Sequence, residues 1–211
     1  MRSDIEVGPR AHVVVLAGSL NPASKAERLA RWCIRRSAEL GASTRLFRGT
    51  DLEFPFYRAG TSECRAAARD YLDELRKADG VLLVSPAYHA SPSGLLKNAL
   101  DYVNELAADA EPYLDGRPIG CVAVAGGDQG AHATLAGLRT ISHALRAWPT
   151  PLGLALSHDR ADADEQGRPT SLRTIAEVDT MLAQVIEMAQ RRAIARTAAC
   201  ADRYPAPGLL R

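Results

Sequence analysis

The sequence lacks the features that mark disulfide-rich, secreted and membrane proteins. The 211 residues include only four cysteines, which are far apart: Cys33, Cys64, Cys121 and Cys200. Such spacing is typical of reduced thiols in a cytoplasm rather than of a disulfide framework. No apolar run approaches the roughly twenty residues that a membrane span needs. The opening MRSDIEVGPR has no apolar stretch and does not resemble a secretory signal. We therefore expect a cytoplasmic protein that does not engage a membrane.

An excess of charge of one sign is also missing. Lysine and arginine total 26 and aspartate and glutamate total 25, which gives a net charge of +1. This balance provides no field for nucleic acid. The five histidines show no ligand spacing, and DADEQG (162–167) resembles an EF-hand loop only until Arg173 replaces the required glutamate. We expect no metal site and no nucleic acid, and a small molecule as the partner.

What the chain does have is a regular alternation of two patterns. Short runs that are apolar on both faces occur at 12–17, 44–47, 80–85, 119–125 and 151–157. Runs with helical periodicity lie between and after them, at 24–40, 63–78, 93–107, 131–147 and 171–196. Strands buried on both faces indicate a parallel sheet. The alternation predicts one domain over 1–211, with its core at about 11–197, as a three-layer α/β sandwich whose five-stranded parallel sheet has the order 2-1-3-4-5.

In such a sheet the ligand lies beyond the carboxyl ends of the strands, where the strand order reverses. This rule selects the segments that follow Ala17, Ser85 and Ala125, at the ends of the first, third and fourth runs. We expect these three loops to converge on one site.

The first loop, GSLNPASK, is rich in small polar side chains and leads into a helix. Ser19, Asn21 and Ser24, with the free N–H groups of the helix N-terminus, suit a phosphate. Neither G-x-G-x-x-G nor G-x-x-x-x-G-K-[ST] occurs, so a Rossmann dinucleotide site and a P-loop are not supported. The alternative is that Ser24 only caps the helix in a capping box with Glu27. Lys25 either balances a phosphate or faces water.

The middle loop follows in SPAYHASPSGLLKNALDYV. Pro86 ends the strand, and Ser91 followed by Pro92 predicts a helix N-cap and first helical residue. Tyr88 and His89 project from the rim where the ligand is expected, so a planar ring system fits beside them. The alternatives are rim packing for Tyr88 and solvent exposure for His89.

The third loop, VAGGDQGAH, contains three glycines. Glycine lets backbone N–H groups approach a ligand closely. This favours a contact from Gly126, Gly127 and Asp128 to a ligand, and the alternative is a flexible turn. His132 fits a helix start or an interface better than catalysis.

Together, GSLNPASK, SPAYHASPSGLLKNALD and AGGDQG resemble the NAD(P)H-dependent FMN reductases of the flavodoxin-like superfamily over about residues 12–190. Their spacing is most similar to that of flavin reductases that serve two-component monooxygenases. The resemblance implies a flavodoxin-like fold, FMN as cofactor and NADPH or NADH as hydride donor in a ping-pong reaction. It also implies a homodimer or homotetramer, formed through the helices after the third and fourth strands, and a flavin-dependent monooxygenase as partner.

The resemblance assigns a role to each loop. It places the FMN phosphate against Ser19, Asn21, Ser24 and Lys25. It places the ribityl chain and isoalloxazine against Pro86, Ala87, Tyr88 and His89. The pyrimidine edge falls to Gly126, Gly127 and Asp128, where backbone donors stabilise charge on the reduced ring. No catalytic side chain is assigned, because the flavin carries the chemistry. Asn21 and Lys25 stand where relatives often have arginine, which favours weaker phosphate binding and a flavin that leaves.

Three other functions remain open. An FMN-retaining quinone, azo or nitroaromatic reductase would place its acceptor near Phe54, Phe56 and Tyr57, although these aromatics also fit core or subunit packing. A flavodoxin electron carrier is typically acidic and has a T-x-T-G-x-T loop, and this chain has neither feature. A nucleotide-binding regulatory module without turnover is the third.

Overall fold

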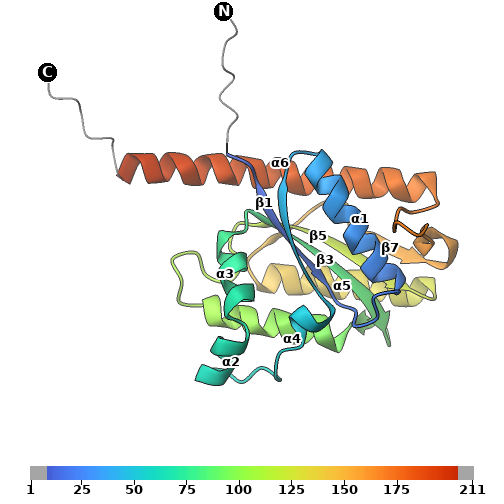
Figure 1. Cartoon of the computed structure of the whole chain (residues 1–211), viewed down its shortest axis with the longest axis horizontal. Helices are drawn as coiled ribbons and strands as arrows, with labels where there is room; N and C mark the ends of the chain where they lie inside the picture. Colours follow the sequence, from blue (N-terminus) through green and yellow to red (C-terminus); the bar gives the residue numbers. More distant parts are fainter. Residues whose placement is uncertain (1–8, 204–211) are drawn as a thin grey trace, which may run out of the picture.

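A parallel sheet runs through the centre of the protein, in a computed structural model that describes residues 9–203 and the side chains of 9–198 (Figure 1). The parallel strands are β1 (His12–Ala17), β2 (Ser43–Arg48), β3 (Gly80–Tyr88), β5 (Pro118–Ala125), β6 (Trp148–Pro149) and β7 (Leu154–Ser157). A short strand, β4 (Ser91–Pro92), pairs with β3 in antiparallel fashion. The order is β2-β1-β3-β5-β6, with β7 also paired to β5. This confirms the predicted order 2-1-3-4-5.

Only β7 lies within the fifth predicted run, and the short strand β6 precedes that run. β6 and β7 both pair in parallel with β5, and the residues between them leave the ladder. Pro149 and Pro151 have no N–H group to donate, which explains the interruption. The prediction of a strand at 151–157 was therefore correct in type but began three residues too early.

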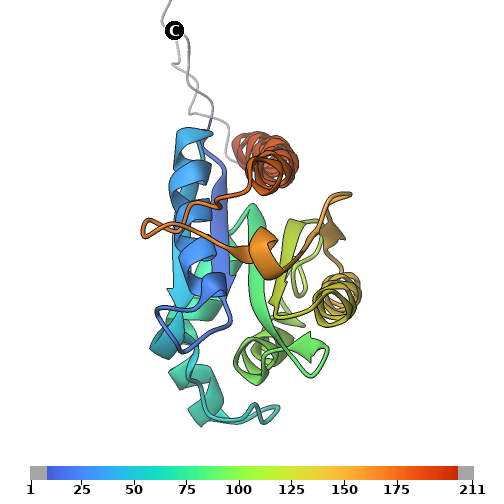
Figure 2. The ribbon, with the colours of Figure 1, turned by 90° about the vertical axis from the view of Figure 1, so that its right-hand side faces the viewer.

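Helices cover both faces of the sheet (Figure 2). On one face lie α1 (Lys25–Glu39) and α6 (Leu172–Arg203). On the other lie α2 (Ser62–Ala67), α3 (Arg69–Lys77), α4 (Gly94–Asp101) and α5 (Asp128–Ala144). The connecting 3-10 turns are η1 (Gly49–Leu52), η2 (Tyr102–Leu106) and η3 (His158–Ala161). In the part of the chain described, no helix is both long and apolar enough to cross a membrane.

Strand β1 shows why the sheet needs both layers. Val13 and Val15 pack into the core under α1 and α6, whereas Val14 and Leu16 pack into the core on the opposite face. Every one of these side chains is at most 1% exposed. A strand that is apolar on both faces is stable only when both faces are covered, as the sequence indicated.

The long helix α6 covers the sheet with one apolar stripe. Val178, Leu182, Val185 and Ala189 are fully buried. The helix does not end at 196 as predicted but continues to Arg203. Arg196 lies within it, and its Nη2 is 3.0 Å from Oδ1 of the buried Asp79.

Two other helices differ from their predicted ranges. The run 63–78 is divided at Ala68, where φ is −107°, into α2 and α3. The run 93–107 is an α-helix only as far as Asp101, after which it continues as the 3-10 helix η2.

The prediction that Ser91 and Pro92 begin a helix was wrong. These residues form β4 opposite Tyr88 and Ala87. The N-cap of α4 is Ser93, whose Oγ accepts a hydrogen bond from the Leu96 N–H at 3.2 Å. The same N-cap chemistry occurs two residues later, because Ser91 and Pro92 complete a hairpin first.

Candidate functional site

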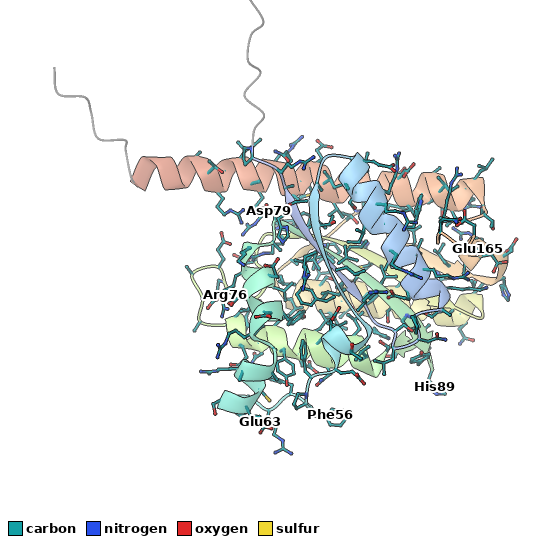
Figure 3. All side chains as sticks on the ribbon, viewed as in Figure 1. Phe56, Glu63, Arg76, Asp79, His89 and Glu165 are labelled. Carbon is teal, nitrogen blue, oxygen red and sulfur yellow. The ribbon has the colours of Figure 1, made fainter. Side chains whose placement is uncertain are left out.

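The carboxyl ends of the central strands lie along one edge of the sheet. Register pairs Ala17 with Val84 across β1 and β3, and Ala125 with Ser157 across β5 and β7. Since these strands are parallel, the loops that follow them emerge at the same edge. Figure 3 shows His89 at this end of β3 and Asp79 at the other end.

The first loop is seated directly on the start of α4. A Cβ atom at Gly18 would lie 2.7 Å from both Leu96 Cβ and Ser93 Oγ, so a larger residue cannot occupy this position without movement. The Gly18 N–H also donates to the Val84 carbonyl at 2.9 Å. The first and middle loops therefore meet, as the topology predicted.

Internal hydrogen bonds shape the first loop. Ser19 is 3% exposed, and its Oγ accepts from the Asn21 N–H at 3.2 Å. Asn21 Oδ1 accepts in turn from the Ala23 N–H at 2.9 Å. Ser24 is the N-cap of α1, and its Oγ accepts from the Glu27 N–H at 3.1 Å. The first turn of α1 therefore points its N–H groups and positive dipole end into the loop, an arrangement that suits a phosphate.

The predicted capping box is only half formed. Glu27 does not return its carboxylate to Ser24; instead Oε1 accepts from Arg48 Nη1 at 2.7 Å. The Ser24 N–H donates to the Asn21 carbonyl at 3.0 Å. Ser24 is therefore a cap, and its hydroxyl still has a proton to donate.

Lys25 is held by a segment that follows β7. Its Nζ lies 2.6 Å from Asp162 Oδ1 and donates to the His158 carbonyl at 3.4 Å. Both side chains are about half exposed, at 43% and 52%. Lys25 therefore neither faces only water nor is unpaired, and a phosphate in this loop would share it with Asp162.

The middle loop forms a tight hairpin with unusual backbone angles. His89 and Ala90 both have positive φ, 51° and 63°, between the paired residues Tyr88 and Ser91. This is the two-residue geometry of a type I′ turn, normally made by Asn and Gly. Non-glycine residues in this region are strained, and such strain gathers at ligand sites. Pro86 is buried, whereas Tyr88 is 56% exposed at the rim.

The third loop leaves open space beside its backbone. A Cβ at Gly126 or Gly127 would meet no atom within 4 Å. Gly127 is the N-cap of α5 with φ −146°, an extended conformation that any residue adopts. Neither glycine is thus required by packing or by strain, which favours a role in letting another molecule approach.

Asp128 opens α5 and is bound to the end of β7. Its Oδ1 accepts a hydrogen bond from Ser157 Oγ. This bond, together with the nearby His158 charge, holds the pKa of Asp128 below its usual range. The sequence analysis missed Ser157 and His158. The strand order contained the signal, because the end of the fifth strand must lie beside the end of the fourth.

Most of the aromatic side chains expected to line an acceptor pocket are instead packed against other residues. Phe54 packs against Tyr102 with ring centroids 5.0 Å apart. The Tyr57 hydroxyl donates to Glu105 Oε1 at 2.8 Å. Only Phe56 of the three is largely exposed, at 88% (Figure 3).

The three described cysteines differ in their pKa. Hydrogen bonds from Thr61 and Tyr102 lower the pKa of Cys64, which is 3% exposed. Burial raises the pKa of Cys33 to about 12 and that of Cys121 to about 11, so neither thiol is a ready nucleophile. Cys200 lies outside the residues whose side chains are described. Within the described part of the chain, no three His, Cys, Asp or Glu residues gather as metal ligands would.

The three loops also fall inside a match to a known family. A family model described as NADPH-dependent FMN reductase matches residues 11–161. The chain belongs to this family. The match confirms the resemblance carried by the three motifs, and it covers all three loops.

Curated relatives of this family member include enzymes named as azoreductases. One is an NADPH azoreductase of Bacillus sp. (strain OY1-2), 38% identical over 94 residues, or 41% of this chain and 49% of the relative. Another is an FMN-dependent NADPH-azoreductase of Staphylococcus haemolyticus (strain JCSC1435), 32% identical over 108 residues, or 51% of this chain and 53% of the relative. The chain therefore spans about half the length of these relatives.

Solved structures of related fold include FerB, a flavoenzyme NAD(P)H:(acceptor) oxidoreductase from Paracoccus denitrificans. The TM-score is 0.70 at 19% identity, covering 86% of this chain and 98% of FerB. A WrbA-like flavodoxin from Agrobacterium tumefaciens gives 0.55 at 16% identity, covering 87% and 99%. At these identities the likeness shows the flavodoxin-like fold alone, which confirms the predicted fold class.

Proposed function

We propose that this protein is an NAD(P)H-dependent FMN reductase that binds FMN at the carboxyl edge of its sheet. The observation that carries the proposal is the meeting of the loops there. Gly18 is seated on the start of α4, and open space lies beside Gly126 and Gly127, all within the matched family region.

Each loop offers chemistry that fits a different part of the flavin. The first loop offers polar groups to the phosphate: Ser19, Asn21, Ser24, Lys25 and the first-turn N–H groups of α1. The hairpin would border the ribityl chain and the ring with Pro86, Ala87, Tyr88 and His89. The third loop has backbone N–H groups beside open space, at Gly126, Gly127 and Asp128. These groups fit the pyrimidine edge of the flavin.

FMN, when bound, supplies hydride chemistry, taking electrons from NADPH or NADH and passing them on in a ping-pong sequence. The residues of the chain bind and orient it. Backbone donors at the third loop stabilise negative charge at the ring edge, and Ser157 holds Asp128 in a fixed direction. No side chain is assigned as acid, base or nucleophile.

The phosphate site favours a flavin that is released. Lys25 is already paired with Asp162, and Asn21 bonds its own loop. We therefore propose that the protein supplies reduced FMN to a flavin-dependent monooxygenase in the cytoplasm. We further propose one domain over 1–211 and a homodimer or homotetramer built through α4 and α5.

A second candidate is an FMN-retaining azo, quinone or nitroaromatic reductase. The names of the two azoreductase relatives favour it. The exposed Tyr88 and Phe56 provide aromatic surface for such an acceptor.

One anaerobic experiment separates these functions. The protein is mixed with NADPH or NADH and an excess of free FMN, and flavin absorbance is followed. Catalytic bleaching of the free flavin is expected for the reductase. Reduction of stoichiometric flavin only, with turnover on adding an azo dye, indicates the second candidate. Absence of reaction with NAD(P)H, together with a stable semiquinone when dithionite is added stepwise, indicates an electron carrier. No flavin binding and no reaction with NAD(P)H indicate a regulatory module.

A further inference from the structure

The third loop carries a negative charge at the edge of the proposed site. Asp128 is the first residue of α5, and its side chain is exposed. It directly follows Gly126 and Gly127, which stand beside open space. The N–H groups in the first turn of α5 attract an anion, and the Asp128 carboxylate opposes that attraction. Both effects act on the part of a ligand that lies against this loop.

The carboxylate is held by the end of β7. Ser157 is 4% exposed, and its Oγ donates a hydrogen bond to Asp128 Oδ1. Pairing of β7 with β5 places Ser157 opposite Ala125, directly before the third loop. The hydroxyl therefore comes from a fixed strand. Because a donor to a carboxylate offsets part of its charge, Ser157 moderates the field of Asp128 as well as its direction.

Asp128 keeps its negative charge at neutral pH. The Ser157 hydrogen bond lowers its pKa against the opposing effect of burial. The charges of His158, His132 and Arg160 lower the same pKa further. Since the ordinary pKa of aspartate is already well below neutral pH, the carboxylate is ionised before and after the reaction.

Reduction of the flavin changes the charge that this carboxylate meets. A hydride from NADPH or NADH brings two electrons and one proton to the oxidised ring, which is neutral, and leaves NADP+ or NAD+. The reduced ring carries one negative charge, at N1 and O2 of its pyrimidine edge. A fixed carboxylate beside that edge repels the reduced ring and has little effect on the oxidised one.

We propose that Asp128 weakens the binding of reduced FMN relative to oxidised FMN, and that Ser157 is a positioning residue that moderates this effect through Asp128. The charge helps the flavin to leave once it is reduced, as a supplier of free reduced flavin requires. This inference rests on the proposed function and deepens it by assigning product release to one side chain.

The test compares the two oxidation states of FMN by anaerobic titration at one pH. Dissociation constants for oxidised and reduced FMN are measured for the wild type and for Asp128→Asn, which keeps an acceptor for Ser157. The variant is expected to bind reduced FMN about tenfold more tightly while changing oxidised FMN less than about twofold. The midpoint potential of the bound flavin should rise by about 30 mV, the two-electron equivalent of that tenfold change.

Ser157→Ala is expected to have the opposite effect. It should weaken reduced FMN about threefold, because the carboxylate loses the donor that offsets its charge. The same substitution made in Asp128→Asn should leave the ratio of the two constants unchanged, since Ser157 acts through Asp128. The matched control is Asp159→Asn, which removes the same charge from an exposed side chain two residues after Ser157 and should also leave the ratio unchanged. Thermal unfolding checks that each variant is folded.

Each contrary result has a distinct meaning. A ratio that is the same in Asp128→Asn and the wild type overturns the inference and leaves the proposed function intact. Equal changes for both oxidation states, or an equal shift in Asp159→Asn, also overturn it, because no charge specific to Asp128 would then distinguish the two forms. An effect of Ser157→Ala that persists in the double variant overturns the role given to Ser157. If neither oxidation state of FMN binds, both proposals fail.

Discussion

Lys25 shows how a single residue can set the residence time of a ligand. Its ammonium group is 2.6 Å from the Asp162 carboxylate, and both groups are accessible to water. A phosphate entering the first loop must compete with that carboxylate for the same positive charge. In the proposed phosphate site, the affinity for FMN would therefore be limited by Asp162, which is more than a hundred positions away in the sequence.

Removing this competitor is expected to tighten binding. Asp162→Asn should lower the dissociation constant for FMN about three- to fivefold, because exposed ion pairs contribute up to about 1 kcal/mol. Fluorescence quenching at low salt measures the effect, which should shrink at high salt. Asp159→Asn, the same charge change on an exposed side chain of the same segment, is the control. Equal effects from both variants would contradict a specific competition for Lys25.

Gly18 and Gly126 have opposite roles that alanine substitutions can separate. Gly18→Ala should lower the free energy of unfolding by about 1–3 kcal/mol, because its methyl group would overlap Leu96 and Ser93. Gly126→Ala meets no protein atom and should leave stability within about 0.5 kcal/mol, while weakening FMN. Urea denaturation and FMN titration of both variants provide the measurements. Unchanged FMN affinity in Gly126→Ala would argue against a ligand beside the third loop.

Among the elements, the β3–β4 hairpin stores strain at the rim of the site. His89 and Ala90 occupy positive φ without being glycine. Ala90→Gly should therefore raise the free energy of unfolding by about 0.5–1 kcal/mol, since the relief of αL strain exceeds the entropy cost of glycine. Thermal denaturation checks this, with Ala87→Gly in the adjacent strand expected to destabilise instead. A lower melting temperature for Ala90→Gly would show that the turn is unstrained.

A second element-scale feature joins α2, the preceding loop and η2. Glu105 accepts hydrogen bonds from Arg65 and Tyr57. Burial raises the pKa of Glu105, but these two partners outweigh it and hold the pKa below its usual range. The carboxylate therefore contributes stability above its unfolded pKa, and this contribution is lost as pH falls through the lower folded pKa.

The pH dependence of unfolding tests this contribution. Glu105→Gln should be less stable than the wild type at pH 7, and the difference should diminish between about pH 5 and pH 3. Urea denaturation across this range measures it. Glu63→Gln, on exposed α2 surface, is the control and should leave the pH profile unchanged. A constant difference across the range would contradict the assignment.

At the scale of the whole molecule, the strand order was predictable because each strand is apolar on both faces. The sequence did not reveal where an element begins or ends when that boundary depends on pairing with another strand. Ser91 and Pro92 were predicted to start a helix, but they pair with β3, and the helix N-cap is Ser93. The break between β6 and β7 follows from prolines that have no N–H group to donate. Whether this loss interrupts a strand depends on which carbonyl groups the neighbouring strand presents.

The meeting of the first and middle loops was predictable to the same extent. Parallel topology brings the first and middle loops together, as Gly18 against Ser93 shows. Partners contributed by distant segments were not predictable. Glu27 was expected only as the partner of Ser24 in an alternative capping box, but it is bonded to Arg48 of β2. Lys25 was expected either to balance a phosphate or to face water, but it is paired with Asp162.

The position of Asp79 has a consequence for motion. This fully buried carboxylate accepts from the His12 N–H at 2.9 Å and lies 3.0 Å from Arg196, which fastens β1, β3 and α6 at the amino end of the sheet. His89 marks the opposite end (Figure 3). Deuterium should therefore label the amides of the loops at the carboxyl end of the sheet long before those at the amino end, so that the proposed site could open while the amino end stays folded.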